Sequence, residues 1–138
     1  MNVLVENMES PDHDLRFMAA NDLLVELEKE SFGLDDAMEK KLVIHVLKLL
    51  QDTNSEVQQI AIKVLAPLMT GIRETNHISL VTQVAALLTS EDGIVRDVAG
   101  VGLKAIINHA PVGGVLAKKL ISILVPKMIL ILSGVLTP

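Results

Sequence analysis

Three stretches of the chain repeat one pattern of apolar and polar positions. Each opens with small polar and acidic residues. An apolar residue follows, with a polar residue directly after it, an alanine four residues further on and a leucine four beyond that. The copies begin near Ser10, Asp52 and Ser90, and successive copies lie 42 and then 38 residues apart. Apolar residues at a spacing of four predict an amphipathic helix, so we expect one helix in each copy.

Further apolar-periodic segments lie between these copies, and we expect each to form a second, outer helix. Two helices in a period near forty residues are typical of HEAT or armadillo-type solenoids, in which helical hairpins stack into an α-α superhelix. We therefore predict an all-α fold and a single domain over residues 1–138, with repeats at about 1–32, 35–73 and 77–110. Residues 113–138 would form an incomplete fourth repeat with an unpaired C-terminal helix.

Capping signals indicate where these helices begin. Ser10 followed by Pro11 predicts the N-cap and first residue of the first inner helix. The segments Asp36–Glu39 and Thr53–Glu56 have the spacing of a capping box and predict two further helix starts. Residues 74–77 are polar, and we expect a turn there before the third outer helix.

The third inner helix, expected at about residues 92–108, contains Gly100 and Gly102. A phosphate-binding loop would place its glycines at the start of a helix, so we attribute these two to close approach of a neighbouring helix. Residues 120–136 are apolar enough to suggest a membrane span. The segment is shorter than the roughly 20 residues that a span requires, and Lys127 near its centre would be costly in lipid. We therefore expect no membrane association.

Composition narrows the possible partners. The chain has two Phe and no Tyr or Trp, which argues against stacking on single-stranded nucleic acid. Its net charge of −5 disfavours polyanion binding, so we expect no nucleic-acid partner. Residues 1–41 contain eleven acidic and four basic residues, a net charge of −7. Such a segment would suit a basic protein surface, or it is simply a solvated helical face.

Candidate chemistry is sparse. The chain has no cysteine, which excludes a disulfide, a cysteine zinc site and a cysteine nucleophile, and fits a reducing compartment. His13, His45, His77 and His109 recur every 32 residues. Because the structural repeat is near forty residues, they occupy different places in successive repeats, and we expect all four on the surface. The sequence therefore predicts a protein that is not an enzyme, with no metal, no cofactor and no small-molecule substrate.

What remains is a surface on the inner helices, on the side away from the core. The repeat offsets bring corresponding positions of the three helices into one continuous patch. We predict protein binding by Asp14, Phe17, Asn21, Asp22, Glu56, Gln59, Lys63 and Asp97. Alternatively, several of these residues simply face water, and Phe17 packs on the next repeat.

Three runs in the sequence closely resemble the start of the cullin-associated, neddylation-dissociated proteins, the CAND family. They are DLRFMAANDLLVELEKESFGLDD at residues 14–36, EVQQIAIKVLAPLM at 56–69 and VRDVAGVGLKAII at 95–107, within a likeness from about Leu4 to Ala110. The resemblance implies a long HEAT solenoid that wraps around a cullin and its RING-box subunit. Such proteins block neddylation of the cullin and exchange the substrate-receptor modules of cullin–RING ubiquitin ligases.

Only the N-terminal repeats of that family are matched, and these lie against the cullin's C-terminal region and the RING-box subunit. We therefore expect those two partners, a location in the cytoplasm and nucleus, and only the N-terminal part of the family's activity. Two alternatives stay open. The chain is a generic HEAT scaffold fragment that binds another protein, or it is a truncated product without independent function.

Overall fold

The computed structural model describes residues 1–109 and residue 122. Within them it contains helices and no strand, which confirms the predicted all-α fold class. The elements are α1 (Asn2–Met8), α2 (His13–Leu27), α3 (Asp36–Leu50), α4 (Ser55–Gly71), α5 (Glu74–Ala86), the short 3₁₀ helix η1 (Leu87–Thr89) and α6 (Gly93–His109). Apart from residue 122, the predicted fourth repeat at 113–138 lies outside the described residues, as does nearly all of the apolar segment at 120–136.

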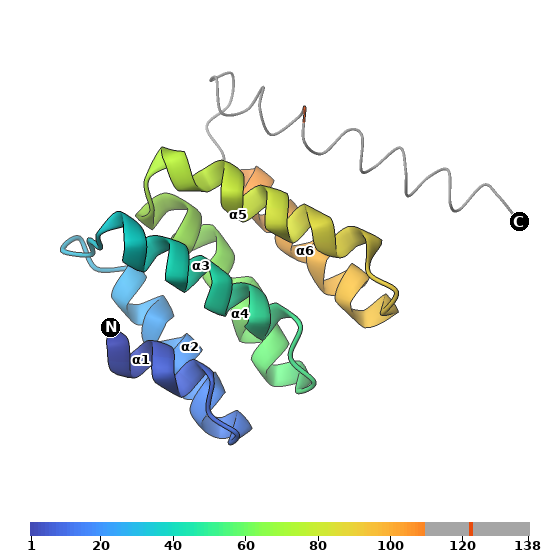
Figure 1. Cartoon of the computed structure of the whole chain (residues 1–138), viewed down its shortest axis with the longest axis horizontal. Helices are drawn as coiled ribbons and strands as arrows, with labels where there is room; N and C mark the ends of the chain where they lie inside the picture. Colours follow the sequence, from blue (N-terminus) through green and yellow to red (C-terminus); the bar gives the residue numbers. More distant parts are fainter. Residues whose placement is uncertain (110–121, 123–138) are drawn as a thin grey trace, which may run out of the picture.

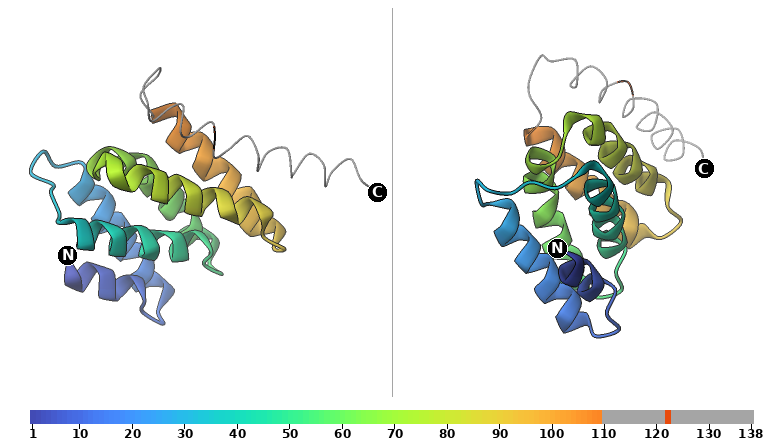
Figure 2. Two further views of the ribbon diagram at one scale, coloured as in Figure 1. Left: turned by 45° about the horizontal axis from the view of Figure 1, so that its top comes forward. Right: turned by 60° about the vertical axis from the view of Figure 1, so that its left-hand side comes forward.

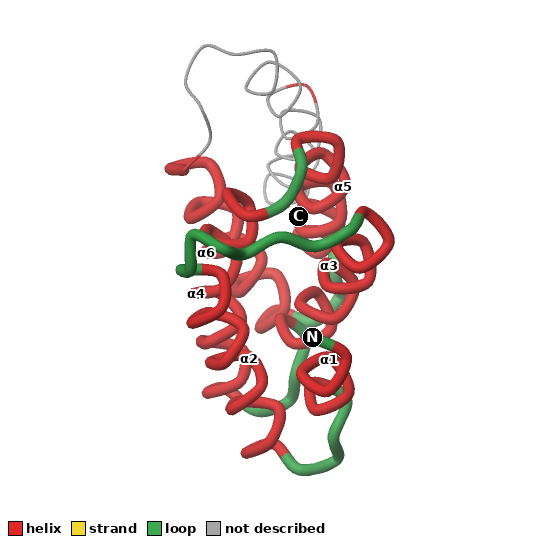
Figure 3. The backbone as a smooth tube through the Cα atoms, turned by 90° about the vertical axis from the view of Figure 1, so that its left-hand side faces the viewer, coloured by secondary structure: helices red, strands yellow, loops and turns green. Residues whose placement is uncertain are grey.

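The helices form two layers (Figure 1). The inner layer consists of α2, α4 and α6 side by side, and the outer layer consists of α1, α3 and α5 (Figure 3). Turned views show the same stacking of one hairpin on the next (Figure 2). Because α2 packs extensively on α4, and α4 on α6, the described part of the chain is a helical-repeat solenoid as the period predicts. None of the helices in this part is long and apolar enough to cross a membrane.

The repeated alanine and leucine positions form the core. Ala19, Ala61 and Ala99 are buried at equivalent places of the three inner helices. The leucines four residues further along, such as Leu65, are also buried, and each contributes about 1.5–3 kcal/mol through lost apolar exposure. Leu15 differs, because it is 40% exposed whereas its equivalents in α4 and α6 are buried.

The inner helices share one N-cap position. The side chains of Asp12, Asn54 and Asp92 each accept a hydrogen bond from the backbone N–H two residues further on, at 2.9 Å in all three repeats. The predicted N-caps are therefore wrong: the cap of α2 lies two residues after Ser10, and the cap of α4 lies one residue after Thr53. The Ser10 hydroxyl instead accepts from the Asp12 N–H at 3.1 Å, within the turn that precedes the helix.

The polar residue of the repeat pattern fixes the turn before each inner helix. Arg16, Gln58 and Arg96 each donate a side-chain hydrogen bond to the backbone carbonyl six residues earlier, over 2.8, 2.6 and 2.6 Å. These bonds satisfy turn carbonyls that have no helical partner. This local role explains why a polar residue follows the first apolar position in every copy.

The predicted start of α3 is also displaced. The N-cap is Asp35, whose carboxylate accepts from the Met38 N–H at 2.8 Å. Glu39, which we assigned to a capping box, is buried and instead accepts from the Arg73 N–H at 2.8 Å and from Arg73 Nη1 at 2.7 Å. It thereby supports the start of α5, where Asn76 donates to the same carboxylate at 3.0 Å. The polar turn predicted at residues 74–77 is therefore wrong, because these residues form the first turn of α5.

Two histidines lie inside the fold, so the surface prediction is wrong for His45 and His77. His45 places Nδ1 at 2.8 Å from the Lys41 carbonyl oxygen and Nε2 at 3.0 Å from the Glu9 carboxylate. His77 places Nε2 at 3.0 Å from the Ile72 carbonyl oxygen. These backbone and carboxylate partners offset part of the desolvation of the rings, although His77 Nδ1 is buried with no hydrogen-bond partner among the described residues. His13 is exposed as predicted, and the side chain of His109 lies outside the described part.

Close helix approach accounts for one of the two glycines in α6. A Cβ atom added at Gly102 would come within 2.7 Å of Leu65 Cδ1 on α4, so the absence of a side chain permits the α4–α6 contact. A Cβ atom added at Gly100 would meet nothing within 4 Å among the described residues. The predicted reason is therefore confirmed for Gly102 and wrong for Gly100.

Candidate protein-binding surface

Most of the residues predicted to bind a partner are exposed on the inner layer. Each inner helix buries one side against the outer layer, which leaves the opposite side of α2, α4 and α6 facing outward. The exposed predicted residues are Asp14, Asn21, Asp22, Glu56, Gln59, Lys63 and Asp97. Phe17 is only partly exposed, because it also packs against the hydrophobic core.

Four of the predicted residues come together in an open hollow between α2 and α4. The hollow has a volume of about 430 Å³. Its lining consists of Phe17, Ser55, Glu56, Gln59, Ile60 and Lys63. We call this feature the α2–α4 hollow. Apolar surface is supplied by one residue from each helix, Phe17 and Ile60, and the remaining lining is polar or charged.

The other predicted residues lie elsewhere. Asp14, Asn21 and Asp97 are exposed but do not line the hollow. Asp22 occupies the repeat position of Val64 and Gly102, which are buried. In the interior repeats that position contacts the preceding inner helix, so Asp22 lies on a different side of α2 from the hollow.

Two residues that line the hollow, Ser55 and Ile60, were not predicted. Ser55 is the first residue of α4, and the sequence indicates only its place near a helix start. Ile60 is nearly fully buried, and its apolar character alone suggests the core. The pairing of α2 with α4 places both residues at the hollow, and no local pattern carries that information.

A part-buried ion pair links α2 to the turn before α4, the two elements beside the hollow. Arg16 on α2 donates to both carboxylate oxygens of Asp52, from Nε at 2.8 Å and from Nη2 at 3.1 Å. Burial would raise the pKa of Asp52, but the hydrogen bonds from Arg16 and from the Asn54 N–H outweigh it and hold that pKa below its usual value. The hydrogen bond to Asp52 in turn raises the pKa of Arg16. This bidentate pair fixes α2 relative to the turn that leads into α4.

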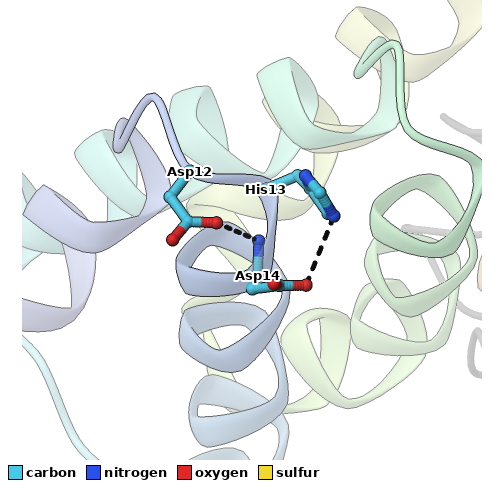
Figure 4. A group of neighbouring side chains, drawn as sticks. All are labelled: Asp12, His13 and Asp14. Atoms are coloured by element: carbon cyan, nitrogen blue, oxygen red, sulfur yellow. Dashed lines mark hydrogen bonds and ion pairs between the residues drawn. The ribbon is translucent and has the colours of Figure 1, made fainter.

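One group of three potential metal ligands occurs within the described residues, at the start of α2 (Figure 4). It consists of Asp12, His13 and Asp14, all exposed. Asp12 uses a carboxylate oxygen to cap α2, and His13 Nε2 lies 3.3 Å from Asp14 Oδ1. Helix capping and local charge pairing account for this arrangement, so we assign no metal or cofactor to it.

Two animal proteins similar to this chain carry the name cullin-associated NEDD8-dissociated protein. "Cullin-associated NEDD8-dissociated protein 1" of Drosophila melanogaster is 46% identical over 108 residues, which is 78% of this chain and 9% of that protein. By sequence, this chain is a relative of the cullin-associated NEDD8-dissociated protein family. The resemblance carried by the three sequence runs is thereby confirmed. "Cullin-associated NEDD8-dissociated protein 2" of Mus musculus is 42% identical over 108 residues, which again is 78% of this chain and 9% of that protein.

A further relative in the family is "Cullin-associated NEDD8-dissociated protein 1, N-terminal part" of Emericella nidulans. It is 30% identical over 114 residues, which is 80% of this chain and 33% of that protein. The chain spans only 9% of the length of the Drosophila and mouse relatives. No protein-family model matches the chain.

Among solved structures, the crystal structure of an engineered protein resembles the fold. It is 27% identical in sequence, with a TM-score of 0.57, and the likeness covers 91% of this chain and 49% of that one.

Proposed function

We propose that this chain is a non-catalytic module that binds the C-terminal region of a cullin together with the RING-box subunit. In this role it regulates the assembly of cullin–RING ubiquitin ligases and the exchange of their substrate receptors. The observation that carries the proposal is the 46% identity, over 78% of the chain, to a protein named for association with cullins and dissociation of NEDD8. With these partners, the module acts in the cytoplasm and nucleus.

The chain supplies only part of the family's activity, since its match covers 9% of the length of two relatives in animals. The match to a protein named as an N-terminal part supports the assignment to the N-terminal repeats. On this proposal, residues 1–138 form one HEAT-repeat domain with an incomplete fourth repeat.

The α2–α4 hollow is the proposed contact point. Its apolar residues, Phe17 and Ile60, suit an apolar side chain of the partner, and the acid Glu56 and the base Lys63 beside them suit a polar or charged end group. A concave apolar site with a few polar groups at its margin is a common form of protein-binding anchor. The hollow is small, so we expect micromolar affinity unless other surfaces contribute.

A pull-down tests the proposal, with a cullin C-terminal fragment and its RING-box subunit as the probe. The expected result is retention at micromolar concentration. Lys63→Glu should weaken binding about tenfold, because it changes the charge at the hollow. Lys41→Glu is the matched control, since Lys41 is exposed on α3 in the outer layer and undergoes the same charge change.

Three outcomes separate the hypotheses. Loss of retention with Lys63→Glu but not with Lys41→Glu supports binding through the hollow. Retention that is indifferent to Lys63→Glu contradicts the hollow as the contact and assigns binding of the complex to another surface of the chain. No retention of the unmodified chain at micromolar concentration contradicts the proposed function itself.

A further inference from the structure

One row of positions runs along each inner helix on the side that faces the preceding repeat. In α4 and α6 the four positions of this row are buried without exception. They are Val57, Ile60, Val64 and Leu68 in α4, and Val95, Val98, Gly102 and Ile106 in α6. The equivalent residues of α2 are Leu15, Met18, Asp22 and Glu26, and we call these four the edge row.

The contacts of the interior repeats show what this row does. Gly102 faces α4, since a Cβ atom added there would come within 2.7 Å of Leu65 Cδ1. Ile60 faces α2, because it lines the α2–α4 hollow together with Phe17. In each interior repeat the row therefore packs against the inner helix before it. Its residues recur at spacings of three and four, which is the spacing with which one helix packs on another.

The edge row has no such neighbour among the described residues. Among the described helices, α2 lies at one end of the inner layer, with α4 on its other side (Figure 3). Leu15 is 40% exposed and Met18 is 57% exposed, whereas Val57 and Ile60 at the same positions of α4 are buried. The surface thus has the spacing of a helix-packing face and exposes apolar side chains without a partner helix.

The chemistry of the edge row differs from that of the interior rows. Its second half is acidic, with Asp22 and Glu26 at positions that are apolar or glycine in α4 and α6. Glu26 is paired with Lys29 at 2.7 Å, but no basic side chain of the described part lies within ion-pair distance of Asp22. An apolar helix stacked on this row would bury the Asp22 carboxylate without a counter-charge, which is strongly unfavourable.

A second copy of the chain is also a poor occupant. The edge row contains no basic residue, so a two-fold pairing of edge rows would offer the two Asp22 carboxylates no counter-charge, and residues 1–41 carry a net charge of −7. Like charges at an interface are destabilising. The occupant that fits both halves of the row is a helix with apolar residues toward Leu15 and Met18 and a lysine or arginine toward Asp22.

We propose that the edge row docks a basic, amphipathic helix of a partner protein, which stacks on α2 where an interior repeat would have its preceding inner helix. That this helix belongs to the cullin–RING-box assembly rests on the proposed function. The edge row is then a contact separate from the α2–α4 hollow. Its acidic half selects the basic partner, and its apolar half supplies buried area.

Cross-linking tests the contact directly. The chain has no cysteine, so Met18→Cys introduces a unique site for a photoreactive label. Ile44→Cys is the matched control, because Ile44 is also a largely exposed apolar residue but lies on α3 in the outer layer. With the cullin–RING-box complex as the probe, the label at position 18 should join a helical segment rich in lysine and arginine, and the label at position 44 should not.

Charge reversal gives the quantitative test. Asp22→Lys should weaken binding of the same complex about tenfold and reduce its salt dependence. Glu91→Lys makes the same charge change at an exposed residue just before α6 and should leave the affinity within about twofold. Thermal unfolding of each variant verifies the fold, and because Asp22 is exposed we expect no loss of stability.

The outcomes discriminate between the two proposals. If the complex binds but Asp22→Lys has no effect and the label at position 18 does not cross-link to it, the edge proposal is overturned and the proposed function stands. Dimers that disappear on Met18→Ala would identify a second copy as the occupant and would likewise overturn it. If the unmodified chain does not bind the complex at all, both proposals are wrong.

Discussion

Truncating Glu39 to alanine should destabilise the protein through the start of α5, although Glu39 itself belongs to α3. The Glu39 side chain is only 2% exposed, and its carboxylate accepts from the Arg73 N–H at 2.8 Å, from Arg73 Nη1 at 2.7 Å and from Asn76 Nδ2 at 3.0 Å. Arg73 is the N-cap residue of α5 and makes no side-chain capping bond of its own. The carboxylate of a different helix therefore satisfies donors at this helix start.

The magnitude follows from what each donor would lose. A buried donor left without an acceptor costs about 1–3 kcal/mol. The part-buried Arg73 N–H would lose its acceptor in this way, and the buried Asn76 amide would lose one of its two bonds but keep the one to Asp36 Oδ1 at 3.0 Å. The Arg73 side chain is 48% exposed, so water replaces the carboxylate there, and that ion pair contributes under about 1 kcal/mol. We expect Glu39→Ala to lower the free energy of unfolding by about 3 kcal/mol in total. The corresponding loss in Tm is about 10 °C.

Urea unfolding followed by helical circular dichroism measures these losses. We expect the largest destabilisation for Glu39→Ala, a smaller one for Asn76→Ala and the smallest for Arg73→Ala. The last substitution removes only the half-exposed side chain of the ion pair with Glu39. Glu74→Ala is the control for a neighbouring exposed acid and should cost no more than about 1 kcal/mol. Two results would refute the reasoning. One is a loss below about 1 kcal/mol for Glu39→Ala, and the other is an equal loss for Arg73→Ala, which would assign the effect to the exposed ion pair.

Two further predictions concern helix packing and pH. Gly102→Ala should destabilise the protein by about 1–3 kcal/mol in urea unfolding, because the new methyl group would come within 2.7 Å of Leu65 Cδ1. Gly100→Ala should instead stabilise it by up to about 1 kcal/mol, since its helical position has open space and alanine has the higher helix propensity; equal effects at the two glycines would contradict the close-approach explanation. The pKa of Asp52 lies below its usual value of 3.8 in the folded protein, so the carboxylate binds its proton less readily there than in the unfolded chain. Its contribution to stability is therefore complete above the unfolded pKa and is lost as the pH falls through the folded pKa. Asp52→Asn should flatten the acid limb of a stability–pH profile below about pH 4, and an unchanged profile would show that the pair with Arg16 does not contribute.

The repeat pattern predicted the helices better than it predicted their ends. Helix starts were misplaced because Ser, Asp, Asn and Thr cluster at each turn, and several of them have a side chain able to cap a helix. At the start of α2, Asp12 caps the helix and Ser10 accepts within the turn. Both roles use the same side-chain chemistry, and only the backbone path decides which residue takes which role.

The repeat pattern also predicted only some of the residues that line the α2–α4 hollow. The offset between repeats placed Phe17, Glu56, Gln59 and Lys63 on corresponding faces, and they do share one hollow. Asp22 was predicted with them, although its equivalents Val64 and Gly102 in α4 and α6 are buried. Asp22 is exposed because no described inner helix packs on this side of α2, and a local pattern cannot show which neighbours a helix has.

By itself, the sequence determined the all-α class, the helical-hairpin period and the buried alanine and leucine stripes. These properties follow from side-chain spacing along a single helix, which is a local property of the chain. The tertiary structure decided the burial of Glu39, His45 and His77 and the shape of the α2–α4 hollow. The partner atoms of Glu39 lie at least 34 residues away in the chain. A polar side chain becomes stable inside a protein only when packing brings such a partner within hydrogen-bond distance.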